Sequence, residues 1–189
     1  MSKSLNDALN FAREKHAGQF RKGSNEDYIT HPIGVAELVD YYFEGVDNLF
    51  ILKVVALLHD TLEDTDASFD ELKNLFGEDV AKLVLELTND ELKKEKYGKE
   101  KYLSLKMKDM SDDALNVKLC DRLYNVKDTI NADIDFRKHY LDETNSIIDF
   151  LIKNRQLHLT QLIITSDIML EITNLQSYDN SQRLLNKKM

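Results

Sequence analysis

The chain has 189 residues, of which 42% are hydrophobic and 31% charged. That length fits one domain with a real core, and no apolar run approaches the roughly 20 residues of a spanning helix, which excludes a membrane-embedded protein. The net charge of −9 gives no bulk attraction for nucleic acid or an anionic membrane surface, so an anionic ligand would need a local cationic site.

Apolar residues recur at helical spacing from the N-terminus onward. A first helix is expected to stop near Gly18, and the polar stretch 17–29 reads as a loop. Pro32 suits the first turn of a second helix, because its missing N–H would be unpaired there anyway. Asp47 is then expected to cap a third helix through ILKVVALLHDTLED, whose centre is apolar on every face and therefore buried.

The second half of the chain continues in helices. Ser68 begins a capping box for a helix that ends at Gly77, and the charged stretch 89–101 reads as a solvated loop or frayed turn. Further helices are predicted at 78–87, 101–110, 112–127, 137–153 and 157–175, with a strand as the competing interpretation of the last. The polar tail 176–189 is a candidate for disorder. An all-α single domain over residues 1–175 follows.

Residues of the kinds that bind metal ions follow two apolar segments of the sequence. His59 and Asp60 end the most hydrophobic helix, and Asp121 follows the apolar segment VKLC. His31 stands at the start of the second helix. Two imidazoles and two carboxylates suit Mn²⁺, Fe²⁺ or Zn²⁺, whereas a buried histidine bonded to an aspartate is ordinary structure when it occurs alone.

Glu63 and Asp64 follow His59 and Asp60 at a spacing of four residues, which places them on the same face of a helix. So many acidic residues at the end of an apolar helix favour a nearby cation. The alternative interpretation is a solvated helix end.

Three segments resemble the HD-domain hydrolases of the RelA/SpoT type, in particular the stand-alone small alarmone hydrolases. They are HAGQFRKGSNEDYITHPIGVAELV at 16–39, the segment 54–90 that begins VVALLHDTLED, and VKLCDRLYNVKD at 117–128. The resemblance covers about residues 5–145 and implies a single HD-domain helical bundle.

The resemblance also implies roles for individual residues. It assigns metal binding to His31, His59, Asp60 and Asp121, and catalysis to the acidic pair Glu63 and Asp64. Arg21, Lys22 and Asn125 match substrate-binding positions. Tyr28 is a further substrate contact if it stacks on a base, with packing as the alternative.

The implied reaction is metal-dependent hydrolysis of ppGpp and pppGpp to GDP or GTP and pyrophosphate, with Mn²⁺ or another divalent metal as cofactor. A phosphatase of another nucleotide such as NADPH and a non-catalytic HD regulatory module are the alternatives. The expected partner is a small nucleotide, with no nucleic acid and no membrane, and no oligomeric state is predicted. One cysteine and no apolar leader favour the cytoplasm.

Overall fold

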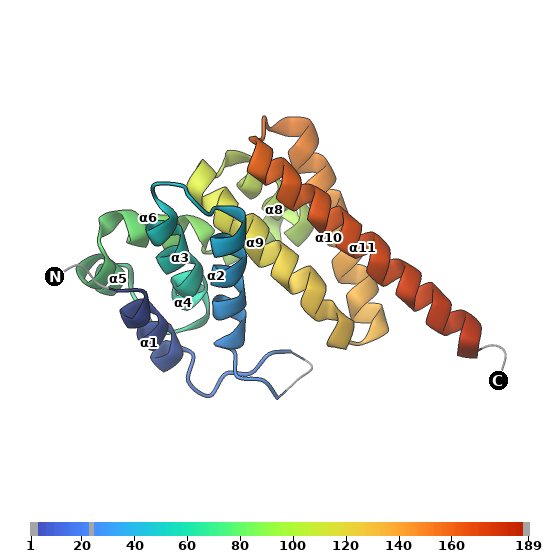
Figure 1. The fold of residues 1–189 in the computed structure, drawn as a ribbon, viewed down its shortest axis with the longest axis horizontal. Helices are drawn as coiled ribbons and strands as arrows, with labels where there is room; N and C mark the ends of the chain where they lie inside the picture. Colours follow the sequence, from blue (N-terminus) through green and yellow to red (C-terminus); the bar gives the residue numbers. More distant parts are fainter. Residues whose placement is uncertain (1–3, 23–24, 187–189) are drawn as a thin grey trace.

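The computed structural model describes residues 4–22 and 25–186, and it confirms the all-α prediction (Figure 1). Within that part of the chain no strand forms, apart from an isolated bridge between Phe20 and Asp27. The helices are α1 (Leu5–Lys15), α2 (Thr30–Tyr42), α3 (Leu49–Leu58), α4 (Thr61–Asp64), α5 (Phe69–Phe76), α6 (Glu78–Leu87), α7 (Glu91–Tyr97), α8 (Lys99–Asp109), α9 (Asp112–Asp128), the 3-10 turn η1 (Thr129–Asn131), α10 (Ile134–Asn154) and α11 (Leu159–Asn186).

Helix α3 forms the centre of the bundle, as its uniformly apolar sequence predicts. Its residues 54–58 are all buried, and α1, α2, α6 and α9 pack around it. Helix α2 also packs on α9, and Gly34 permits a close approach because a Cβ there would lie 1.9 Å from the Tyr124 ring. This approach brings the start of α2 and the middle of α9 to the same end of α3.

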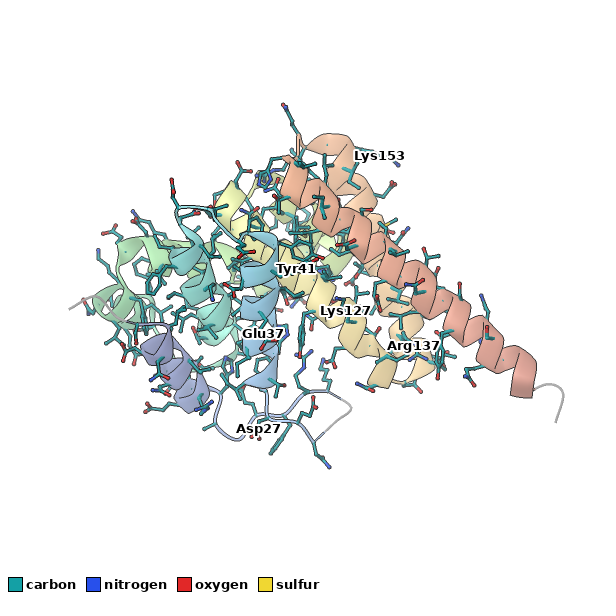
Figure 2. All side chains as sticks on the ribbon, viewed as in Figure 1. Asp27, Glu37, Tyr41, Lys127, Arg137 and Lys153 are labelled. Carbon is teal, nitrogen blue, oxygen red and sulfur yellow. The ribbon has the colours of Figure 1, made fainter. Side chains whose placement is uncertain are left out.

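Helix α11 is longer than its sequence pattern predicts. The expected end near residue 175 is wrong, since the helix continues to Asn186, and residues 176–186 of the expected tail are helical. Figure 1 shows this helix as the long diagonal rod that packs on α9 and α10. Arg137 at the start of α10, labelled in Figure 2, supplies the reason: its guanidinium donates to Asp179 at 2.5 and 3.1 Å. The competing strand interpretation is also wrong.

The charged stretch 89–101 is not the expected loop. It contains α7 and the start of α8, separated at Gly98, which adopts a φ of 80°. The side chain of Asp90 begins α7 by accepting from the backbone N–H of Lys93 at 3.0 Å. No residue of α7 is buried, so its sequence carries no apolar stripe that would reveal a helix.

The helix cap predicted at Asp47 is wrong, and the capping box predicted at Ser68 is present in part. The third helix begins after Asn48 rather than Asp47, and the Asn48 amide donates to the Asp113 carboxylate at 2.8 and 2.9 Å instead of capping its own helix. At Ser68 the hydroxyl accepts from the Glu71 backbone N–H, which is the first half of the predicted capping box.

Within residues 4–22 and 25–186 no helix is long and apolar enough to cross a bilayer.

The Arg137–Asp179 pair gives a stability prediction. Replacing Asp179 with Ala leaves a buried guanidinium without its carboxylate, so we expect a loss of about 3 kcal/mol in the free energy of unfolding. Urea denaturation measures it. The exposed Lys153–Asp149 pair is the control, and Asp149→Ala should cost less than about 1 kcal/mol. Equal effects of the two substitutions would contradict the structural role of Asp179.

Candidate metal centre

His59 and Asp60 lie in a break between two helices. The sequence predicts one helix through HDTLED, but α3 ends at Leu58 and α4 begins at Thr61. The Thr61 hydroxyl donates to the Leu58 carbonyl at 2.7 Å, which satisfies an acceptor that the broken helix leaves open. The break turns both side chains toward the start of α2 and the middle of α9.

The four predicted ligands converge. The Nε2 atoms of His31 and His59 lie 3.2 Å apart, and the Asp60 Oδ2 atom lies 3.4 and 3.0 Å from them. Asp121 Oδ1 approaches the same two nitrogens at 3.2 and 3.7 Å. His31, His59 and Asp121 are buried, with ligand atoms within 4.8 Å of one another, whereas the Asp60 side chain is 18% exposed.

Neighbouring groups orient these ligands. The His59 Nδ1 atom lies 2.7 Å from the Ala56 carbonyl oxygen, so Nδ1 carries a proton and donates it, which turns Nε2 inward as the ligand atom. Asp121 is held through both oxygens, since Lys118 Nζ donates to Oδ2 at 2.8 Å and Asn125 Nδ2 donates to Oδ1 at 2.6 Å.

The electrostatics of the cluster favour a bound cation. Burial alone lowers the pKa of His59, but the carboxylates of Asp60 and Asp121 outweigh it and raise that pKa to about 10. Burial likewise opposes ionisation of the two aspartates, yet the nearby cationic groups hold both pKa values well below the usual range. The cluster thus attracts positive charge, and its nitrogen and oxygen donors fit a divalent transition metal.

Asp64, one residue of the acidic pair, lies next to this cluster. The Tyr28 hydroxyl lies 2.6 Å from Asp60 Oδ2 and 3.3 Å from Asp64 Oδ2, so it connects a ligand residue with Asp64. Burial and the charges of Asp60 and Glu63 raise the pKa of Asp64. Glu63 accepts from the backbone N–H and side-chain amide of Asn89 at 2.9 and 3.0 Å. Glu63 is therefore anchored, and does not behave as a freely solvated helix end.

The ring of Tyr28 is already packed. It stacks on His16 with ring centroids 4.7 Å apart and an interplanar angle of 30°, and it meets His31 edge-on. Burial and the neighbouring carboxylates raise the pKa of the hydroxyl far above its usual range, so it remains a hydrogen-bond donor. This geometry favours packing over base stacking for Tyr28.

A cleft of about 680 Å³ opens beside the cluster. Five predicted site residues line it: Arg21, Lys22, Tyr28, Asp64 and Asn125. Sequence reasoning missed other lining residues, namely Phe20, Lys99, Phe136 and Tyr140. Lys99 lies in the stretch read as a solvated loop. The rings of Phe136 and Tyr140 stack with centroids 6.1 Å apart. The spacing of four residues between them in the sequence could have indicated that both aromatic side chains lie on the same face of a helix.

Arg21 lies in the stretch 17–29 that the sequence predicts to be a loop, yet its side chain is largely buried. Its guanidinium pairs with Asp128 at 2.7 Å, donates to Asn125 Oδ1 at 2.9 Å, and its side chain is only 12% exposed. Lys22 is exposed. The next two residues of the loop, Gly23 and Ser24, lie outside the described residues. Arg21 therefore stabilises the cleft wall as well as charging it.

The family model described as HD domain matches residues 8–156. The chain belongs to the HD-domain family. HD phosphohydrolases are metal-dependent, in agreement with the His/Asp cluster described above. The match ends before α11.

Named relatives share much of the chain. The zebrafish protein guanosine-3′,5′-bis(diphosphate) 3′-pyrophosphohydrolase MESH1 is 42% identical over 125 residues, which are 66% of this chain and 68% of that protein. The pyrophosphohydrolase of Aquifex aeolicus is 42% identical over 143 residues, covering 74% of this chain and 20% of the longer enzyme. A solved structure titled as a metazoan ortholog of SpoT that hydrolyzes ppGpp superposes with a TM-score of 0.75 at 28% identity, covering 90% of this chain and 96% of that one.

The ligand set gives a direct prediction. Replacing His59 or Asp121 with Ala should remove the bound metal and nearly all hydrolysis, because each supplies a ligand atom that the other residues cannot replace. Elemental analysis of the purified variants measures metal content. His139→Ala, at an exposed histidine of α10, is the control and should retain metal. Full occupancy in both ligand variants would reject the assignment.

Proposed function

We propose that this chain is a metal-dependent hydrolase of guanosine 3′,5′-bis(diphosphate) and of the pentaphosphate, which it converts to GDP or GTP and pyrophosphate. The observation that carries the proposal is a His/Asp cluster adjoining a cleft that contains Arg21, Lys22 and Lys99. MESH1 proteins named for this reaction are 42% and 40% identical to the chain over about two thirds of its length.

The cleft has the size that such a substrate needs, and three cationic side chains line it. Its volume of about 680 Å³ lies within the range of small-molecule sites. The net charge of the chain is −9, so binding of a polyanion depends on the local cations Arg21, Lys22 and Lys99. Asn125 donates to Asp121 and accepts from Arg21, which ties the cationic wall to the metal centre.

The metal ligands in the proposal are His31, His59, Asp60 and Asp121, with Mn²⁺ as the cation. A divalent ion held by these residues would lower the pKa of a nearby water toward neutral pH. The carboxylates of Asp64 and Glu63 would orient the attacking water and accept its proton, and the raised pKa of Asp64 suits a proton acceptor. Water oxygen bonds to the phosphorus next to the ribose, the bond from phosphorus to the 3′-oxygen breaks, and this oxygen gains a proton.

The cations have a separate task in the reaction. Arg21, Lys22 and Lys99 offset the negative charge that shifts onto phosphate oxygens as the bond breaks. Arg21 is held in advance by Asp128 and Asn125, so little reorganisation is needed when substrate binds. The cellular setting we propose is the cytoplasm, where a free buried thiol such as Cys120 stays reduced.

The acidic pair should affect turnover more than metal binding. We expect Glu63→Gln and Asp64→Asn to lower kcat at least about 10²-fold, the usual scale for general acid–base groups, while most metal remains bound. Steady-state kinetics and elemental analysis measure the two quantities. Glu78→Gln, which disturbs only exposed pairs with Lys73 and Lys82, is the control. Near-normal rates in both variants would leave the pair without a catalytic role.

The choice of substrate is tested by identifying products. With Mn²⁺ present, guanosine tetraphosphate should yield GDP and pyrophosphate, at a higher kcat/KM than release of orthophosphate from NADPH. Chromatography of the nucleotides and separate assays of pyrophosphate and orthophosphate distinguish the reactions. Intact guanosine tetraphosphate alongside consumed NADPH would refute the alarmone assignment and leave the metal centre standing. A chain that binds both nucleotides and hydrolyses neither would instead be a regulatory module.

A further inference from the structure

Asn89 makes a two-point contact with Glu63. It lies after the end of α6, 26 residues along the chain from Glu63, and is partly buried. Its backbone N–H donates to Oε2 at 2.9 Å and its side-chain amide donates to Oε1 at 3.0 Å. Because both carboxylate oxygens are engaged by one residue, rotation of the Glu63 carboxylate is restricted.

Lys106 on α8 fixes the orientation of the Asn89 amide. Its ammonium group lies 3.1 Å from Asn89 Oδ1. An ammonium group can only donate and an ionised carboxylate can only accept, so Oδ1 must face Lys106 and Nδ2 must face Glu63. The result is a directed chain of hydrogen bonds from a cation to an anion.

Lys106 is itself held in place by the end of α6. It donates to the carbonyl oxygens of Leu87 at 2.7 Å and Thr88 at 2.6 Å, where the helix dipole favours a cation. Burial lowers the pKa of Lys106 to about 8, so most of the group is still charged at neutral pH. Three acceptors leave its ammonium group little freedom to move.

We propose that Asn89 and Lys106 are positioning residues for Glu63 in the catalytic step. The inference deepens the proposed function, on which it rests, and concerns residues to which the family resemblance assigns no role. Asn89 holds the carboxylate in one orientation relative to the metal cluster, and Lys106 holds Asn89. Loss of either contact should therefore lower kcat through Glu63 and leave the metal ligands in place.

Kinetics of Asn89 variants test the proposal. Asn89→Ala, and Asn89→Leu as a variant of similar volume, remove the side-chain donor but keep the backbone donor, so we expect kcat to fall by about tenfold. KM and metal content should stay within about twofold. Asn48→Ala is the matched control, because this amide also binds a carboxylate at two oxygens, that of Asp113. A fall in kcat shared by Asn48→Ala, or none in either Asn89 variant, would overturn the inference.

A double-mutant cycle separates positioning from general destabilisation. If Asn89 acts through Glu63, then adding Asn89→Ala to Glu63→Ala should change kcat by less than about twofold, although it lowers kcat about tenfold in the wild-type background. Lys106→Met should behave in the same way. Fully additive effects would mean that both residues act independently of Glu63.

Hydrogen exchange tests the contact without any substrate. The backbone N–H of Asn89 donates to Glu63, so Glu63→Ala should speed its exchange by at least about tenfold. The backbone N–H of Thr88, bonded to Val84 within α6, should exchange at an unchanged rate. An unchanged rate at Asn89 would refute the contact. This result is independent of the substrate, so it is distinguishable from a failure of the proposed reaction.

Discussion

The structure depends on the approach of two imidazole nitrogens to two carboxylates inside an apolar bundle. His31 Nε2 and His59 Nε2 lie 3.2 Å apart, and Asp60 and Asp121 face them. Such a cluster is costly to bury unless positive charge balances the carboxylates. Three features hold the four residues together: the break after α3, the close packing of α2 on α9 at Gly34, and the hydrogen bond from the buried Lys118 to Asp121.

Two amide side chains hold the acidic pair in place through hydrogen bonds. Asn89 holds the carboxylate of Glu63, while Gln19 donates to the backbone carbonyl of Asp64 at 2.8 Å. Gln19 in turn lies 2.8 Å from the buried ring of His16, which stacks on Tyr28. Gln19, which precedes α4 in the chain, and Asn89, which follows it, therefore hold the two acidic residues separately, and Asp64 lines the cleft.

Sequence reasoning found the features that have a local signal. His59, Asp60 and Asp121 follow apolar runs, and polar residues in such places need partners, so their convergence could be anticipated. Helix α7 could not be found from periodicity, because none of its residues is buried. The end of α11 was missed because the Arg137–Asp179 pair joins residues 42 apart in the chain. Asn89 and Lys106 were missed for the same reason, because the role we propose for them depends on contacts between residues that are distant in the chain.

A metal ion at the His/Asp cluster can be located by diffraction. Anomalous diffraction from crystals grown with Mn²⁺, collected on either side of the manganese absorption edge, tests the metal site most directly. We expect one strong anomalous peak enclosed by His31, His59, Asp60 and Asp121, which disappears in crystals of the Asp121→Ala variant. A cluster without an anomalous peak at saturating Mn²⁺, or a peak held by other residues, would contradict the metal site.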